Sequence, residues 1–298
     1  MLTQKVLRLQ PREDFVLTPH IENLCRRAMT YLDAGYACHF RGSAGTGKTT
    51  LAMHVANQRG RPVIMMFGDE EIVTSDLVGR EKGMVSTKVT DNFVRSVHKT
   101  QEVRRPQWVD SRLTTACKHG YTLVYDEFSR SRPEANNVLL AVLEERILPL
   151  PDTPGGAYMP VHPEFRAVFT SNPEDYAGVH KTQSALRDRM ITIEVDYYDR
   201  DTEIAITQAR AGADRAVAEK IVEMVRRIRA DGASQQPTLR ASVMIARILK
   251  QIGGERPFED PLFMDACLDV LHPTPPAGRD GRWMVAQGAI RTAILGLR

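Results

Sequence analysis

The sequence predicts an α/β protein in which a mostly parallel sheet of about five strands is followed by a smaller all-helical domain. The first observation is that short apolar runs alternate with helix-like segments over the first two thirds of the chain. The second is that helical periodicity dominates after Tyr198. The third is the length of 298 residues, which is enough for roughly two domains.

The expected strands are short apolar runs bounded by turn residues. They cover residues 36–40, 62–67, 121–125, 166–170 and 191–195. The segments between them are typical of helices, because they carry start signals and apolar residues at helical spacing. Thr18-Pro19, a hydroxyl followed by a proline, is one start signal, and Ser131 and Glu134 form a capping box before a helix predicted over 135–145. Two further helices are predicted over 48–58 and 109–118.

Two stretches are less regular. Residues 77–79 and 83–85 are predicted as short strands or turns, and the prolines and glycines of 149–163 predict a hairpin or an exposed loop. Beyond 198, two apolar stripes at helical spacing predict packed helices, and they are formed by Val217, Ile221, Met224, Val225 and Ile228, and by Val243, Ile245, Ile248 and Leu249. We therefore expect an N-terminal arm over 1–17, an α/β domain over 18–198 and a helical domain over 199–298.

Composition excludes several classes of protein. Hydrophobic residues make up 42% and charged residues 26%, which excludes disorder throughout, collagen and a disulfide scaffold. A net charge of +3 makes no general case for nucleic acid, so no specific nucleic-acid partner is expected. No apolar run approaches the ~20 residues of a membrane span, and the N-terminus has no signal-peptide core. The four cysteines show no CxxC spacing and are expected to be reduced thiols of a cytoplasmic protein.

The strongest motif is a glycine-rich loop that lies between an expected strand and an expected helix. Residues 42–49 match the pattern G-x-x-x-x-G-K-[ST] of P-loop NTPases at every fixed position. The glycines let backbone N–H groups point at phosphate oxygens, Lys48 supplies a charge for the β- and γ-phosphates, and Thr49 presents a hydroxyl to Mg²⁺. The predicted nucleotide-binding residues here are Gly42, Ser43, Ala44, Gly45, Thr46, Gly47, Lys48, Thr49 and Thr50.

A second motif is the acid pair that ends the strand over 121–125. Asp126 is expected to hold Mg²⁺, directly or through water, and Glu127 to polarise the attacking water. Strands often end in acids at a solvent edge, so the pair alone would be weak. It follows the glycine loop by about 80 residues, and each motif supports the other.

Four further polar residues complete the candidate site. Asn172, after the strand over 166–170, can orient water against the γ-phosphate, although an Asn-Pro turn alone would be an ordinary turn. Arg187 and Arg189 can reach the γ-phosphate of a neighbouring subunit and stabilise transition-state charge. Arg240, at the start of a helix in the second domain, can touch the nucleotide and relate its state to the domain angle.

With these residues in view, the chain resembles an AAA+ ATPase, because its motifs follow that family's order one for one. Within the family it resembles the MoxR branch through residues 130–140, 143–145 and 162–173. Residues 125–134 and the small size resemble the gas-vesicle members of that branch. One departure is Ser43-Ala44, where the branch usually has a proline. These positions contribute backbone N–H groups, so the difference leaves nucleotide binding intact.

The resemblance implies an ASCE-type parallel sheet with a C-terminal helical lid, and a homo-oligomeric ring, expected to be a hexamer, with ATP at subunit interfaces. It makes Arg189 the preferred arginine finger, with Arg187 as the alternative, and Arg240 the second sensor. The stretches 76–100 and 149–163 would be inserted segments of this branch. It implies Mg-dependent ATP hydrolysis that remodels shell or accessory proteins during gas vesicle assembly.

Two alternatives stay open at this point. The client could instead be a metalloenzyme or a von Willebrand A-domain partner that a MoxR-type ATPase activates. The chain could also be a nucleotide-gated scaffold with little hydrolysis, although intact Lys48, Asp126, Glu127 and Asn172 argue against this. A DNA-directed function is more distant, and would require a basic stripe in the assembled ring.

Overall fold

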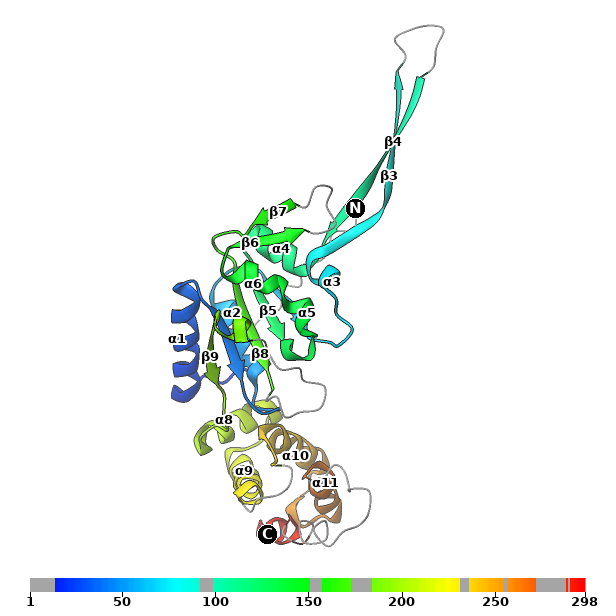
Figure 1. Cartoon of the computed structure of the whole chain (residues 1–298). Coiled ribbons are helices and arrows are strands. Elements are labelled where there is room, and N and C mark those ends of the chain that lie inside the picture. The colour runs from blue at the N-terminus through cyan, green and yellow to red at the C-terminus, as the bar shows by residue number, and fades with distance from the viewer. Residues whose placement is uncertain are drawn as a thin grey trace. The chain divides into compact units, whose positions relative to one another are not determined.

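A computed structural model describes residues 14–91, 99–150, 157–172, 184–230, 236–254, 257–271, 288 and 290–297 (Figure 1). These residues form two compact units. One is built from Met29–Phe40 and Val55–Ile193, and the other from Pro11–Ala28, Arg41–His54 and Glu194–Arg298. The predicted boundary after residue 198 stays a prediction.

The predicted sheet is confirmed, with five strands in the order β2-β5-β8-β1-β9. The pairs β2–β5 and β5–β8 are parallel, and Tyr125 is in register with Met66 on one side and Phe169 on the other. The strands are β1 (Ala37–Arg41), β2 (Val63–Phe67), β5 (Thr122–Asp126), β8 (Arg166–Ser171) and β9 (Met190–Glu194). Each lies within one residue of its predicted run, because a strand buried on both faces is a continuous apolar segment.

Helices and two hairpins connect the strands of the sheet along the chain. The helices of the first part are α1 (Pro19–Asp33), α2 (Lys48–Gln58), α3 (Thr74–Val78), α4 (Arg112–His119), η1 (Phe128–Arg130), α5 (Pro133–Asn136), α6 (Val138–Leu143) and α7 (Ser184–Arg187). The predicted start of α1 is confirmed, since Thr18 Oγ1 accepts from the Ile21 N–H at 3.4 Å. The core is centred on β5, whose five residues are all buried.

The capping box predicted at Ser131 is wrong. The N-cap of α5 is Arg132, and no side-chain cap bond is made there. Ser131 Oγ instead accepts from the Asp69 N–H at 3.1 Å and shares a hydrogen bond with the Tyr125 hydroxyl at 2.7 Å. Its hydroxyl is buried against the end of the sheet, where a tertiary partner competes successfully with the local one.

Of the two segments predicted as short strands or turns, 83–85 lies in a strand of a long antiparallel hairpin, whereas Leu77 and Val78 end the helix α3 and only Gly79 belongs to the strand. Figure 1 shows β3 (Gly79–Asp91) and β4 (Lys99–Asp110) running side by side, with a register shift between Glu81 and Met84. The helix expected from 109 therefore begins only at Arg112, after β4 ends. A second hairpin pairs β6 (Ile147–Leu150) with β7 (Ala157–Pro160). This confirms the hairpin of the two structures predicted for 149–163, and its loop lies outside the described residues.

The residues that the structure describes after 199 are mostly helical, as predicted. They contain α8 (Arg200–Ala211), α9 (Arg215–Ala230), α10 (Leu239–Ile252), η2 (Pro257–Glu259) and α11 (Pro261–Leu271). The first apolar stripe is buried apart from half-buried Val217, whereas in the second only Ile245 and Leu249 are fully buried. All four cysteines are buried free thiols, as expected. None of the described helices is long and apolar enough to cross a membrane.

Candidate active site

The glycine loop connects β1 to α2, the strand-to-helix setting that the motif requires. Gly45 and Gly47 have φ angles of +81° and +85°, which residues other than glycine rarely adopt. A Cβ on Gly42 would lie 2.0 Å from the Val195 carbonyl oxygen. Each of these glycines is therefore required by the backbone path of the loop.

The loop holds its own lysine at the binding face. Lys48 is 6% exposed, and its Nζ donates to the Ser43 carbonyl at 2.7 Å. Thr46 Oγ1 donates to the same carbonyl at 2.9 Å. The Lys48 ammonium group, the loop glycines and the start of α2 together form a site that fits phosphate oxygens.

Arg240 lies in the same unit as the loop and close to it. A Cβ on Gly45 would meet Thr238 Oγ1 at 2.4 Å and the Arg240 Cβ at 3.4 Å. Thr238 is the N-cap of α10, and Arg240 is an exposed residue in its first turn. The structure therefore brings the predicted second sensor to the phosphate loop.

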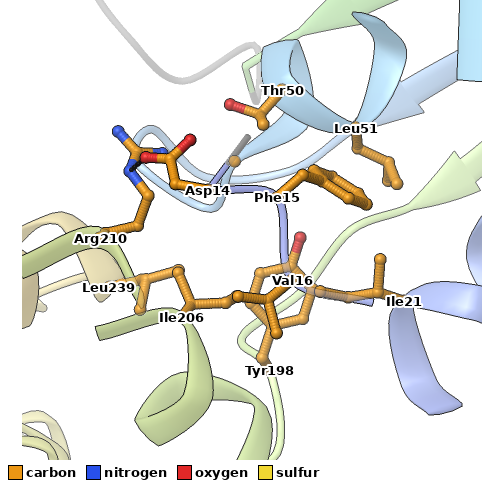
Figure 2. A pocket seen from close by; sticks show the side chains of 11 residues that line it. Asp14, Phe15, Val16, Ile21, Thr50, Leu51, Tyr198, Ile206, Arg210 and Leu239 are labelled. Atoms are coloured by element: carbon orange, nitrogen blue, oxygen red, sulfur yellow. Dashed lines mark ion pairs between the residues drawn. The ribbon is translucent and has the colours of Figure 1, made fainter. Parts of the chain in front are cut away.

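A pocket opens beside the loop, with an empty volume of about 420 Å³ that includes open solvent (Figure 2). Its walls are mostly apolar, and an ion pair between Asp14 and Arg210 at 2.9 Å lies at one end. Phe15 stacks on His54 with 3.8 Å between ring centroids. The lining residues are Asp14, Phe15, Val16, Ile21, Gly47, Thr50, Leu51, Tyr198, Ile206, Arg210 and Leu239.

Sequence reasoning found only Gly47 and Thr50 among these lining residues. The others come from the chain start, the β9–α8 connection and two helices, and no local pattern marks a wall assembled from such distant segments. The apolar walls of the pocket and the few polar groups at its edge are typical of the lining of small-molecule sites. An adenine ring is flat, largely apolar on its faces, and fits this description.

The acid pair ends β5 in the other unit. Asp126 is buried, and its Oδ1 accepts from Thr170 Oγ1 at 2.5 Å, while the same hydroxyl accepts from the Glu127 N–H at 2.9 Å. Glu127 has left-handed backbone angles of φ 51° and ψ 39°. Gly68 packs behind it so closely that a Cβ there would lie 2.0 Å from the Glu127 carbonyl oxygen. The turn that presents the two acids is therefore held from both sides.

The side chain of Glu127 faces Arg130 on η1. Arg130 Nη1 lies 3.2 Å from Glu127 Oε2, and both side chains are about half exposed. An ion pair of this exposure contributes little to stability, on the order of 0–1 kcal/mol. The ion pair nevertheless directs the Glu127 carboxylate, which the motif predicts to activate water, toward Arg130.

Asn172 follows the last residue of β8, which is the parallel neighbour of β5. Because the carboxyl ends of parallel strands meet at one sheet edge, Asn172 lies at the edge that carries Asp126 and Glu127. The strand end is fixed by His39 on β1, which bonds Ser171 Oγ through Nε2 at 2.8 Å and Thr192 Oγ1 through Nδ1 at 3.0 Å. His39 carried no motif, and sequence reasoning missed it.

The two candidate arginine fingers differ in their surroundings. Arg187 is exposed at the end of α7. Arg189 Nη1 donates to the Ala185 carbonyl at 2.6 Å, and its Nη2 pairs with Glu144. Arg187 and Arg189 both stay candidates for contact with a neighbouring subunit's nucleotide.

A divalent cation is implied by the motif, and each unit offers one oxygen donor of a suitable kind. Mg²⁺ prefers oxygen ligands and is usually held by one or two protein groups together with phosphates and waters. The Thr49 hydroxyl and the buried Asp126 carboxylate are such oxygens. Among the described residues, no group of three or more histidine, cysteine, aspartate and glutamate side chains is arranged to hold a metal by itself.

The sheet order, phosphate loop and acid pair define a P-loop ATPase of the AAA+ class. The family model described as "AAA domain (dynein-related subfamily)" matches residues 40–190. Among solved structures, the fold is similar to the RuvB Holliday junction branch migration motor of Thermotoga maritima, with a TM-score of 0.51 and 17% identity. The match covers 83% of this chain and 66% of that one, and at this identity it supports the fold alone.

Curated relatives narrow the assignment. The chain is 54% identical to the gas vesicle ATPase GvpN of Ancylobacter aquaticus, over 90% of this chain and 76% of that protein. It is 42% identical to the gas vesicle ATPase GvpN of Haloferax mediterranei, over 89% and 76% respectively. The chain therefore belongs to the gas vesicle ATPase GvpN family. The resemblance drawn from the motifs is therefore confirmed for the AAA+ class, for the MoxR branch and for its gas-vesicle members.

Proposed function

We propose that this ATPase is a Mg-dependent remodelling factor for gas vesicle assembly, which acts on shell or accessory proteins as a homo-oligomeric ring, expected to be a hexamer. The observation that carries the proposal is the buried Lys48 in a glycine loop that opens onto an apolar pocket. The relationship to gas vesicle ATPases at 54% identity supplies the biological setting. Its place of action is then the cytoplasm, at growing gas vesicles.

In the proposed binding mode, the adenine ring occupies the pocket between Val16, Tyr198 and Leu239. The triphosphate lies on residues 42–50, whose backbone N–H groups and Lys48 offset its charge. Thr49 and Asp126 would hold Mg²⁺, which supplies Lewis-acid polarisation of the phosphates when bound. Arg240, next to Gly45, contacts the phosphates from the start of α10 and reports whether the γ-phosphate is present.

In the proposed hydrolysis step, the Glu127 carboxylate accepts a proton from the attacking water while Asn172 orients that water. The water oxygen forms a bond to the γ-phosphorus, and the bond between that phosphorus and the bridging oxygen breaks, leaving ADP and phosphate. Thr170 holds Asp126 and the Glu127 backbone in a fixed relation, so little reorganisation accompanies the reaction.

In the proposed ring, Arg189 offsets γ-phosphate charge on a neighbouring subunit, with Arg187 as the alternative. To act there, Arg189 must exchange its partner Glu144 for the phosphate. Glu144 is about half exposed, so its pairing with Arg189 is screened by solvent and opposes this exchange only weakly.

The test is steady-state ATP hydrolysis against protein concentration, with Mg²⁺, for the wild type, Glu127→Gln and Arg189→Ala. We expect activity per subunit to rise with concentration. Both variants should retain nucleotide binding, with Arg189→Ala losing about 10³-fold in turnover, the scale of an arginine finger. A wild type that binds ATP but hydrolyses it no faster than Glu127→Gln, with or without purified gas vesicle proteins, favours the nucleotide-gated scaffold instead.

The gas vesicle assignment is tested separately, by complementation of a host that lacks its own copy of this ATPase. We expect the wild type to restore gas vesicles and Glu127→Gln to fail at equal protein level. Restoration by Glu127→Gln would show that hydrolysis is dispensable for assembly. Failure of the active wild type in this host would favour a different client, of the kind that MoxR-type ATPases activate.

A further inference from the structure

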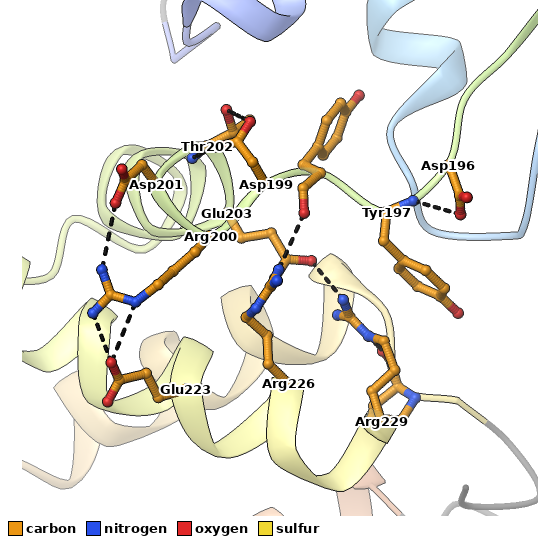
Figure 3. A network of polar contacts seen from close by, with 12 residues as sticks. Asp196, Tyr197, Asp199, Arg200, Asp201, Thr202, Glu203, Glu223, Arg226 and Arg229 are labelled. Carbon is orange, nitrogen blue, oxygen red and sulfur yellow. Dashed lines mark hydrogen bonds and ion pairs between the residues drawn. The ribbon is translucent and has the colours of Figure 1, made fainter. Parts of the chain in front are cut away.

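A buried charge network joins the first two helices of the C-terminal region (Figure 3). Glu203 on α8 is 1% exposed. Its Oε2 accepts from Arg226 Nη1 at 3.0 Å, and its Oε1 accepts from Arg229 Nη1 at 2.9 Å, both from α9. A buried carboxylate is tolerated only when it is paired, so the two arginines and Glu203 hold one another in place.

Arg229 also reaches the segment before α10. Its Nε donates to the Pro237 carbonyl at 2.8 Å, and its guanidinium lies 4.1 Å from the centre of the Tyr197 ring. Pro237 is followed by Thr238, the N-cap of α10 that meets Gly45 of the phosphate loop. The planar guanidinium therefore fixes the point from which Arg240 extends.

Arg226 makes a similar contact with the segment between β9 and α8. Its Nη1 also donates to the Tyr198 carbonyl at 3.1 Å. The Tyr198 ring lines the pocket, and its hydroxyl lies 3.6 Å from where a Cβ on Gly47 would be. One buried glutamate thus anchors both segments that approach the glycine loop from the helical region.

We propose that Arg229 is a positioning residue for Arg240. The Arg229 guanidinium, held by Glu203 and stacked on Tyr197, sets the start of α10 so that Arg240 lies over the phosphate loop. The inference rests on the proposed role of Arg240 in hydrolysis. The three contacts require a planar fork with several donors, which arginine offers and lysine lacks.

The test is a double-mutant cycle on ATP hydrolysis with Arg229→Lys, Arg240→Ala and the combined variant. Lysine keeps the charge that neutralises Glu203 but loses the Nε donor to Pro237 and the stack on Tyr197. We expect Arg229→Lys to lower kcat about tenfold, the scale of one charged hydrogen bond, with a smaller change in KM for ATP. In the Arg240→Ala background it should have no further effect. Arg227→Lys, an exposed position on the same helix, is the matched control.

The outcomes separate the two claims. If Arg240→Ala alone leaves hydrolysis unchanged, the proposed role of Arg240 fails and the inference falls with it. If Arg240→Ala lowers hydrolysis but Arg229→Lys lowers it equally in both backgrounds, the proposed function stands and the positioning role is overturned. Tyr197→Leu keeps the Glu203 pairs and removes the stack, together with the hydrogen bond that the Tyr197 hydroxyl donates to Gln236 Oε1 at 3.2 Å. With Tyr197→Phe, which loses that hydrogen bond but keeps an aromatic ring, as its control, it carries the same cycle if Arg229→Lys does not fold.

Discussion

At the scale of single residues, the candidate site and the helices beside it depend on a few polar side chains that each hydrogen-bond to two partners. The Thr170 hydroxyl donates to Asp126 and accepts from the Glu127 N–H, and so ties the two acids together. Glu203 satisfies two arginines at once. Groups of this kind are expensive to remove, because every partner they leave is buried or functional.

Thr170→Val tests the first of these groups. Valine keeps the shape but removes the hydroxyl, so Asp126 loses a hydrogen bond in a buried position. We expect turnover to fall about tenfold and stability to fall by about 1–3 kcal/mol, as measured by steady-state hydrolysis and denaturant unfolding. Thr170→Ser keeps the hydroxyl and should retain most activity. Retained activity in Thr170→Val together with a loss in Thr170→Ser would show that the methyl group, rather than the hydroxyl, matters.

Arg130→Ala tests the ion pair that directs the Glu127 side chain. Without Arg130 the carboxylate is free to turn to water, and the lost pair is weak. We therefore expect basal hydrolysis to rise, by up to about fivefold for an interaction of 0–1 kcal/mol. Arg132→Ala, an exposed neighbour, is the control. A fall in hydrolysis on removing Arg130 would mean that the arginine assists the reaction.

At the scale of elements, the connections between strands and helices carry the chemistry. The phosphate loop follows β1, and the acid pair and Asn172 follow β5 and β8. The glycine loop also touches the N-cap of α10, so that its shape and the start of a distant helix depend on each other.

Gly45→Ala tests this element contact. The substitution combines an unfavourable φ of +81° with a clash at Thr238 Oγ1, so it should both destabilise the unit and weaken nucleotide binding. Gly35→Ala is the matched control, since its φ is +95° and nothing lies within 4 Å of the new Cβ. Unfolding midpoints and nucleotide titrations of both variants give the comparison. We expect nucleotide affinity to fall at least tenfold for Gly45→Ala alone, a cost of about 1.4 kcal/mol.

Much of this arrangement could be predicted from sequence, for identifiable reasons. Strands buried on both faces, such as 122–126, are continuous apolar runs, and the glycine loop has a fixed spacing. The β3–β4 hairpin was missed although Val85, Thr87 and Val89 alternate at the period of a strand, because charged residues interrupt the pattern. Thr170 and Glu203 could not be assigned roles, since their partners are set by tertiary packing.

At the scale of the whole molecule, nucleotide binding should be visible as global stabilisation. A ligand that binds only the folded chain adds RT ln(1 + [L]/Kd), about 2.7 kcal/mol at a hundredfold excess over Kd. For a chain of 298 residues, whose unfolding entropy is about 0.6 kcal/mol/K, we expect the thermal midpoint to rise by about 4 °C with Mg-ATP. Lys48→Ala should lose this rise. A nucleotide-induced shift of equal size in Lys48→Ala would place binding outside the glycine loop.

The β3–β4 hairpin also constrains how its family can diversify. Its two strands pair with each other in antiparallel register, so the addition of one residue to one strand would turn every later side chain to the opposite face. An unpaired residue can be absorbed only as a bulge, as at the register shift between Glu81 and Met84. Length changes that add no bulge must come as matched pairs of residues on both strands, which alters the arm in steps of about 7 Å.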